Sequence, residues 1–183
     1  MEKENVLSKM FWGRIDFYSV AAYYYFQKGS GVQHLLHAIK YNGATQAARE
    51  VGKMYGSELK ESPYFNSVDI IIPVPLHPSK KKKRGFNQSD FIAEGIAEGL
   101  NSNWSPEILV RDVASETQTK KSRFNRWKNV ESAFSLKDQK AVEGKHVLIV
   151  DDVITTGATL ESSANCLANL PNTKISVAAI AFA

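Results

Sequence analysis

Two adjacent carboxylates and a turn rich in hydroxyl groups follow an apolar run late in the sequence. The acids are Asp151 and Asp152, the apolar run covers residues 147–150, and the turn covers residues 155–159. A turn that opens a helix presents free N–H groups and a positive dipole end, which together stabilise a phosphate. Neighbouring carboxylates accept hydrogen bonds from the hydroxyls of a diol. The pattern therefore predicts a site for ribose 5-phosphate.

The predicted site has two parts with different tasks. The phosphate part consists of Thr155, Thr156, Gly157, Ala158 and Thr159. Gly157 allows a close approach of the backbone to the ligand, and the threonines add hydroxyl donors. The sugar part consists of Asp151 and Asp152, which are expected to bind the 2- and 3-hydroxyls. The same two acids suit a Mg²⁺ ion that is held largely through the ligand.

The elements that must position these groups alternate along the chain. Strands are predicted at residues 17–26, 68–74, 107–110, 145–151 and 174–182, and helices at 32–41, 45–59, 89–100 and 160–170. Ser89 or Asp90 is expected to cap the third helix. Alternating strands and helices from residue 68 onward favour an α/β fold with a mainly parallel sheet. The strand at 145–151 is expected to end at the two acids, at the edge where open α/β sheets bind ligands.

The segment Val147–Leu160, VLIVDDVITTGATL, resembles the phosphoribosyl pyrophosphate (PRPP) signature of the type I phosphoribosyltransferases. This resemblance implies that fold, with helices flanking the sheet and a small hood, and it implies PRPP and Mg²⁺ as ligands. Two other interpretations stay open at this point: a strand with two acids and a helix cap, and metal-binding acids of another phosphate-transfer domain. Neither GxxxxGK[ST] nor GxGxxG occurs, which argues against a P-loop or dinucleotide fold.

A second segment, PVPLHPSKKKKRGFNQS, resembles the ComF family, whose members are associated with competence. The resemblance implies a pyrophosphate loop at Pro75, Leu76, Arg84 and Gly85. Phe86, Asn87 and Gln88 also match the family pattern. The alternative is a surface turn with a solvated run of charge. The position about 65 residues before the PRPP signature favours the functional interpretation.

A third segment, 111–134, also resembles ComF. The matching residues are Arg111, Gln118, Arg126, Asn129 and Phe134. In type I phosphoribosyltransferases this region is a flexible loop that closes over the site and excludes water. The resemblance implies that Arg126, together with Arg84, neutralises the leaving pyrophosphate. The alternative is a disordered basic loop.

The N-terminal third carries a weaker signal. The stretch 35–43, LLHAIKYNG, resembles the helix that precedes the core in ComF proteins, and Lys40 and Tyr41 are interpreted as lining the acceptor side. His34 and His37 are too few for a metal site. We expect residues 1–60 to form a hood and residues 61–183 a phosphoribosyltransferase-like core, within one compact domain.

Composition limits the other possibilities. The chain has 183 residues and a net charge of +4, with basic clusters at 80–84 and 120–128 that suit an anionic partner. Its one cysteine, Cys166, is expected to be a small buried hydrophobe, so the four-cysteine zinc module common in ComF proteins has no counterpart in these residues. No apolar run reaches the roughly 18 residues that span a bilayer. We expect a cytoplasmic protein without membrane insertion.

The leading hypothesis is a phosphoribosyltransferase that binds PRPP with Mg²⁺, transfers the phosphoribosyl group to a nucleophile and releases pyrophosphate. The alternative is a non-catalytic protein that senses PRPP or binds single-stranded DNA in DNA uptake. Phe124 and Trp127, among the basic residues, leave base stacking open. A homodimer also stays open, and the sequence contains no interpretable code for the acceptor.

Overall fold

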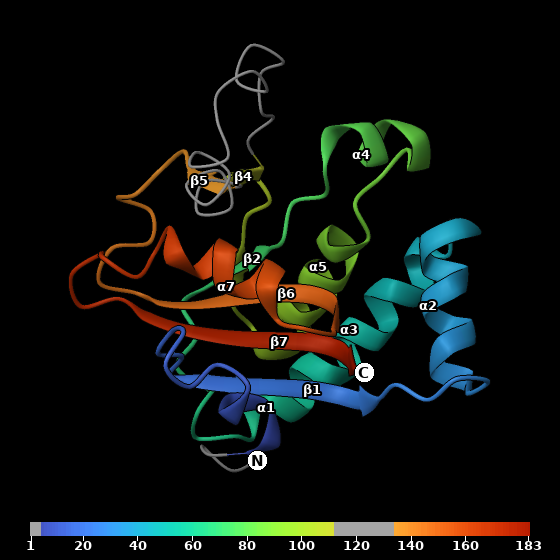
Figure 1. Cartoon of the computed structure of the whole chain (residues 1–183), viewed down its shortest axis with the longest axis horizontal. Helices are drawn as coiled ribbons and strands as arrows, with labels where there is room; N and C mark the ends of the chain where they lie inside the picture. Colours follow the sequence, from blue (N-terminus) through green and yellow to red (C-terminus); the bar gives the residue numbers. More distant parts are fainter. Residues whose placement is uncertain (1–4, 112–133) are drawn as a thin grey trace.

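The computed structural model describes residues 5–111 and 134–183. Its centre is a five-stranded parallel sheet with the order β1-β7-β6-β2-β3 (Figure 1). The strands are β1 (Ser19–Tyr25), β2 (Ile70–Pro73), β3 (Asn103–Trp104), β6 (His146–Ile154) and β7 (Lys174–Phe182). β6 lies in the middle of the sheet and pairs with β2 and β7 on its two sides. The mainly parallel sheet predicted from the sequence is confirmed.

Both faces of the sheet are covered, which explains why its central strands are continuously apolar. Leu148 and Val150 of β6 join a core cluster with α3 (Thr45–Lys60) and α5 (Gln88–Leu100). Val147 and Ile149 point to the other face, into a cluster that includes Leu160 of α7 (Ala158–Asn165). The alternation of β6 side chains between two cores fixes the register of the strand that carries Asp151 and Asp152.

Helices α3 and α5 pack unusually closely through glycines. A Cβ atom at Gly52 of α3 would lie 2.5 Å from the carbonyl oxygen of Ile92 in α5. The glycines that weaken the predicted helix at 45–59 are therefore used for this approach. The close contact fixes α5, whose N-terminal end faces the carboxyl end of β6.

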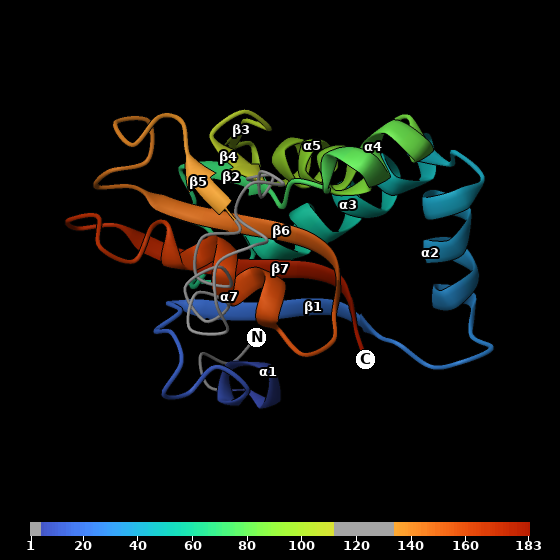
Figure 2. The same ribbon diagram turned by 45° about the horizontal axis from the view of Figure 1, so that its top comes forward.

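Helix α2 (Gly31–Tyr41) stands beyond the carboxyl ends of the strands (Figures 1 and 2). It begins at Ser30, whose side chain accepts a hydrogen bond from the backbone N–H of Gln33. A short helix, α1 (Val6–Lys9), packs beside β1. The edge strand β1 and α3, both within the predicted hood range 1–60, form part of the sheet and of the layer that covers it. The boundary at residue 60 stays a prediction.

Three predicted boundaries around the acids are wrong. β6 does not end at Asp151 but continues to Ile154, because Asp151, Val153 and Ile154 keep their pairing with β7. The acids thus lie on a regular strand near its end. The following helix, α7, begins at Ala158 instead of residue 160 and ends at Asn165 instead of residue 170.

The basic cluster was predicted to be a loop, and this prediction is wrong. Residues Pro78–Arg84 form helix α4, with Pro78 in its first turn and Gly85 at φ 87° after its last. Helix α5 begins at Gln88 with Asn87 as its N-cap, so neither Ser89 nor Asp90 is the cap. The strand predicted at 107–110 appears as β4 (Leu109–Arg111), which pairs antiparallel with β5 (Phe134–Leu136) in a separate two-stranded sheet.

Candidate functional site

The two acids lie where β6 meets α5 and α2. Asp151 Oδ1 accepts hydrogen bonds from the Ser89 hydroxyl at 3.2 Å and from the backbone N–H of Asp152 at 2.8 Å. Asp152 is 6% exposed, and its Oδ2 lies 2.7 Å from Nζ of Lys40 at the end of α2. Asp151 is therefore held by Ser89 of α5, and Asp152 is held by Lys40 of α2.

Burial raises the pKa of Asp151 to about 7, and the negative charge of Asp152 acts in the same direction. The Asp152 amide, the Ser89 hydroxyl and Lys40 oppose this shift. The charged form of Asp151 is thus costly without a ligand. Hydroxyl donors or a cation beside it would stabilise that form, which is the environment that a sugar diol with Mg²⁺ provides.

The turn at 155–159 joins β6 to α7 and is exposed except at Gly157. Gly157 adopts φ +74°, and a Cβ atom there would lie 2.5 Å from the Phe11 ring. Only glycine fits this position without displacing Phe11. The hydroxyl of Thr156 accepts a hydrogen bond from the backbone N–H of Ala158 at 3.4 Å. The turn therefore presents hydroxyls and the start of a helix to solvent, as the predicted phosphate cradle requires.

The underside of this turn rests on Phe11 and Arg14, which we call the N-terminal brace. Phe11 is 1% exposed and packs edge-on against Phe17. Arg14 donates a hydrogen bond to the carbonyl oxygen of Thr156 at 3.2 Å and forms an ion pair with Glu161 of α7. The sequence interpretation missed the brace, because a lone aromatic and a lone arginine about 145 residues away give no local signal.

The segment predicted as a pyrophosphate loop connects β2 to α5. Pro75 and Leu76 are half-buried and lead into α4. Asn87 donates hydrogen bonds to the carbonyl oxygen of Val74 at 3.1 Å and to Asp90 at 2.6 Å. The Asn87 side chain thus holds the start of this segment against the start of α5, from which Ser89 reaches Asp151.

Arg84 at the end of α4 faces the end of α2. It donates a hydrogen bond to the Gln88 side chain, and its guanidinium lies 5.7 Å from the centre of the Tyr41 ring. The predicted residues Arg84, Lys40 and Tyr41 are therefore neighbours. Arg126, Gln118 and Asn129 lie outside the described residues.

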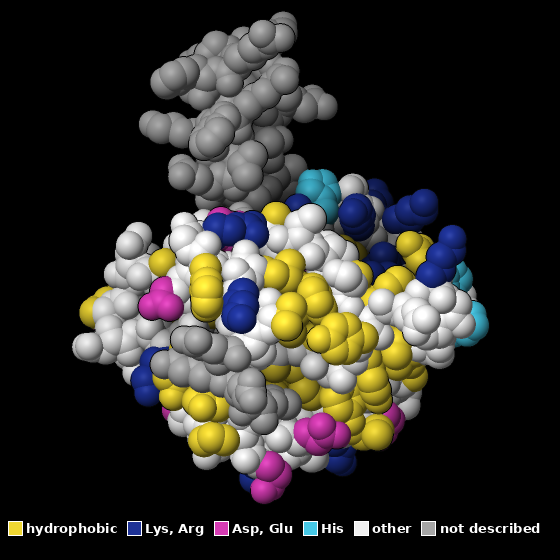
Figure 3. Space-filling model, turned by 60° about the horizontal axis from the view of Figure 1, so that its bottom comes forward, with side chains coloured by type: hydrophobic (Ala, Val, Ile, Leu, Met, Phe, Trp, Pro, Cys, Tyr) yellow, Lys and Arg dark blue, Asp and Glu magenta, His cyan; other side chains and the backbone are white. Residues whose placement is uncertain are grey.

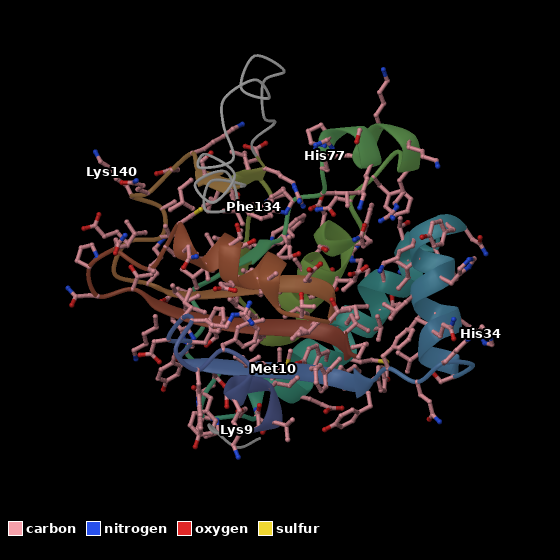
Figure 4. All side chains as sticks on the ribbon, in the orientation of Figure 1. Lys9, Met10, His34, His77, Phe134 and Lys140 are labelled. Atoms are coloured by element: carbon pink, nitrogen blue, oxygen red, sulfur yellow. The ribbon has the colours of Figure 1, made fainter. Side chains whose placement is uncertain are left out.

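A cavity of about 480 Å³ opens between the end of α2 and α4, and we call it the cationic pocket. Its lining residues are Lys40, Tyr41, Gly43, Lys80, Lys83, Arg84 and Phe86. Figure 3 shows Lys, Arg and His side chains gathered along one edge of the surface, and Figure 4 shows His77 at the start of α4. Because Lys40 also contacts Asp152, the pocket adjoins the acids.

Two other predicted residues lie away from this region. Arg111 ends β4 with its guanidinium 5.0 Å from the centre of the ring of Phe134, which opens β5. Cys166 follows α7, is half-buried, and its thiol donates to the Phe134 carbonyl oxygen at 3.1 Å. It packs beside the α7-side core, as predicted for a small apolar residue, although it is only partly buried.

Comparison with known proteins identifies the family. Residues 57–183 match the phosphoribosyl transferase domain. The chain belongs to this family. It is 33% identical over 136 residues to the DNA utilization protein YhgH of Escherichia coli O157:H7, covering 73% of this chain and 59% of that protein. The chain therefore spans little more than half the length of that relative.

Two competence proteins are also similar to this chain. Competence protein F of Haemophilus influenzae is 36% identical over 110 residues, covering 60% of this chain and 48% of that protein. ComFC of Bacillus subtilis is 36% identical over 98 residues, covering 54% and 38%. The resemblance to ComF stated from the sequence is confirmed.

Solved structures support the fold. The structure described as the allosteric regulatory enzyme of purine biosynthesis matches with a TM-score of 0.50 and 25% identity, covering 72% of this chain and 26% of that one. A glutamine PRPP amidotransferase from B. subtilis gives the same TM-score and coverage at 23% identity. The type I phosphoribosyltransferase-like fold is confirmed. Among the helices of residues 5–111 and 134–183, none is long and apolar enough to cross a membrane.

Proposed function

We propose that this chain binds PRPP with Mg²⁺ and transfers the phosphoribosyl group to a nucleophile, releasing pyrophosphate. The observation that carries the proposal is the junction of two features at one end of β6. A half-buried acid with a raised pKa, Asp151, and a buried acid, Asp152, lie just before an exposed turn whose buried glycine opens a helix. Membership of the phosphoribosyl transferase domain family supports the same ligand.

Different residues bind different parts of PRPP. Thr155, Thr156, Gly157, Ala158 and Thr159 bind the 5-phosphate, and Asp151 and Asp152 bind the diol. Pro75, Leu76, Arg84 and Gly85 bind the pyrophosphate, and Arg84 with Arg126 neutralises its charge as it leaves. Lys40 holds Asp152 in place from the hood.

The transfer is a substitution at C1 of the ribose. A lone pair of the nucleophile forms the new bond to C1, and the C1–O bond to pyrophosphate breaks with both electrons on the leaving oxygen. The proton of the nucleophile passes to solvent. This chain contributes positioning, exclusion of water and charge neutralisation, since no covalent intermediate is required.

Mg²⁺ fits the residues present. Asp151 and Asp152 offer oxygen ligands, and the residues that the structure describes contain no group of three or more His, Cys, Asp or Glu side chains that would hold a metal by themselves. Mg²⁺ commonly takes one or two carboxylates and completes its shell with water and substrate phosphate oxygens. When bound, the ion would supply positive charge to the pyrophosphate.

Calorimetric titration with PRPP tests the binding part. We expect Mg²⁺-dependent binding to the wild-type chain and at least about tenfold weaker binding to a Thr155→Val/Thr156→Val double variant, which keeps the size of both side chains and removes their hydroxyls. Ser105→Ala, a change in a loop at the end of β3, serves as a control that should leave binding intact. No binding to the folded wild-type chain would contradict the proposal.

A second candidate is a protein that binds PRPP or single-stranded DNA without turnover. The printed names of the relatives, which refer to DNA utilization and competence, favour it, as do the four exposed lysines at 80–83. Pyrophosphate release with a panel of amines and bases separates the two candidates. Binding of PRPP without release by any acceptor favours the second, and DNA binding that survives excess PRPP indicates a separate nucleic-acid surface.

A further inference from the structure

We infer that the cationic pocket between α2 and α4 receives the acceptor, and that the acceptor is an aromatic or heteroaromatic molecule that carries negative charge. The inference rests on the proposed transferase function and names its missing substrate class. The charge of the pocket, its rings and its position beside the acids each support part of it.

The charge of the pocket has one sign. Lys80, Lys83 and Arg84 reach it from α4, Lys40 reaches it from α2, and no Asp or Glu is among the lining residues. Within the described part of the chain, only Lys40 of these four forms an ion pair. Lys80, Lys83 and Arg84 converge on a cavity with no carboxylate in its lining, and the neighbouring Asp152 is paired with Lys40. This surplus of positive charge favours an anionic occupant, since low-dielectric walls strengthen the attraction.

The aromatic character comes from two rings in the lining, one from α2 and one from the segment after α4. Tyr41 is 69% exposed although it belongs to the lining, and Phe86 is half-buried. The Arg84 guanidinium already lies 5.7 Å from the centre of the Tyr41 ring. A flat acceptor can stack on such a ring or on the guanidinium plane while its anionic group meets the lysines.

The position of the pocket matches the chemistry. Lys40 lines the pocket and also contacts Asp152, which we propose binds the ribose diol. A ribose held by the two acids therefore has the pocket as its neighbour. A volume of about 480 Å³ is in the range of small-molecule sites and suits one mono- or bicyclic compound.

The pocket is not explained by the pyrophosphate alone. Of the residues proposed for pyrophosphate, only Arg84 lines it. Lys80 and Lys83 lie one turn apart on α4, and Lys81 and Lys82 lie between them without lining the pocket. This arrangement provides a matched pair of variants: Lys80→Gln/Lys83→Gln removes two charges from the pocket, and Lys81→Gln/Lys82→Gln removes two charges from the same helix outside it.

The experiment measures pyrophosphate release from Mg²⁺-PRPP with acceptor pairs that differ by a carboxylate, orotate against uracil and anthranilate against aniline. We expect release with an anionic member and little with its neutral partner. Lys80→Gln/Lys83→Gln should raise the KM of the anionic acceptor about tenfold or more and leave the Kd of PRPP within about twofold. Lys81→Gln/Lys82→Gln should change neither by more than about twofold.

Five results would overturn the inference. Equal turnover of charged and neutral partners, or no turnover of any member, removes the charged acceptor but leaves PRPP binding intact. If Lys80→Gln/Lys83→Gln raises the Kd of PRPP as much as the KM of the acceptor, the pocket binds the pyrophosphate instead. Loss of oligo-dT binding in Lys80→Gln/Lys83→Gln, with acceptor kinetics unchanged, assigns it to nucleic acid. A wild-type chain that fails to bind PRPP by calorimetry removes the proposed function, and this inference with it.

Discussion

The turn at 155–159 and helix α4 both face the proposed ligand, but they are built in opposite ways. The turn follows a strand buried between two cores, and it rests on Phe11 and Arg14 from the N-terminal brace. Helix α4 has no buried residue, and its four lysines are exposed. One region presents backbone and hydroxyl groups on a fixed support, and the other presents long charged side chains.

This difference separates two tasks. A backbone cradle on a packed support is pre-organised, so it gives affinity for a ligand of constant shape such as a 5-phosphate. Exposed lysines reach a ligand with a loss of side-chain entropy, and they discriminate by charge more than by shape. We therefore expect changes at the turn to weaken PRPP binding strongly, and changes at α4 to alter acceptor choice.

The largest expected effect comes from an alanine at Gly157. The substitution combines a strained φ of +74° with a Cβ atom 2.5 Å from the Phe11 ring, so Phe11 must move. We expect a loss of about 2–3 kcal/mol in the free energy of unfolding and a weakening of PRPP binding by roughly 100-fold or more. Urea unfolding and calorimetry measure the two effects.

Gly144, just before β6, is the matched control. It has a φ of +70°, but a Cβ atom there would meet nothing within 4 Å, and it lies at the end of β6 opposite the acids. Gly144→Ala should therefore cost only the strain of the backbone, about 1 kcal/mol, and leave PRPP binding intact. Equal losses of stability for the two variants would show that the contact with Phe11 contributes nothing.

The next largest effect is expected at Asp151, where binding and stability change in opposite directions. The folded pKa of about 7 lies above the ordinary value of 3.8. The folded chain thus holds a proton that the unfolded chain loses, and stability falls as pH rises from about 4 through 7. Asp151→Asn should not show this fall, so its free energy of unfolding at pH 8 should exceed that of the wild-type chain by on the order of 2 kcal/mol. Its PRPP binding should be roughly 100-fold weaker.

Asp152→Asn is the comparison for that variant. It removes the partner of Lys40 and leaves a half-buried ammonium without its carboxylate. We expect it to destabilise the free chain, in contrast to Asp151→Asn. Thermal unfolding at pH 5 and pH 8 separates the two, and a parallel pH profile for both variants would contradict the assignment of the raised pKa to Asp151.

A smaller effect is expected when the brace is cut. Arg14→Gln removes the hydrogen bond to the Thr156 carbonyl oxygen and the ion pair with Glu161, whereas Glu161→Gln removes the ion pair only. We expect about five- to tenfold weaker PRPP binding for Arg14→Gln and less than about twofold for Glu161→Gln, because an exposed ion pair contributes little. Equal calorimetric values for both variants would assign the whole effect to the ion pair.

The two regions also differ in how far the sequence predicts them. The run from Val147 to Thr159 specifies a buried strand, two acids and a helix-opening turn by local pattern, and the fold and the order of these parts are confirmed. The strand end was misplaced because pairing with β7, which is not visible in local sequence, extends β6 to Ile154. Helix α4 was missed because consecutive lysines have no apolar periodicity, although Pro78 and Gly85 mark its two ends.

Contacts between distant residues account for the rest. Phe11 under Gly157, Lys40 on Asp152 and Ser89 on Asp151 join residues that are 62 or more positions apart. Their side-chain types are common, so nothing local in the sequence predicts these pairings. The resemblance to ComF includes Asn87 and Gln88 but gave no role to Ser89. The role proposed for Arg126 stays a prediction, since that residue lies outside the described part of the chain.

Ser89 provides the finest test of how the acids are held. Its buried hydroxyl donates to Asp151 Oδ1 and lowers the pKa of that carboxyl, against the larger effect of burial. Ser89→Ala should therefore raise the pH at which the fall in stability ends, because the folded pKa of Asp151 rises. It should also weaken PRPP binding about three- to fivefold. Ser176→Ala removes another fully buried hydroxyl, the one bonded to His146 Nε2, away from the acids. It should reduce stability without moving that pH. If both variants keep the wild-type pH profile, Ser89 fills space beside Asp151 and does not set its charge.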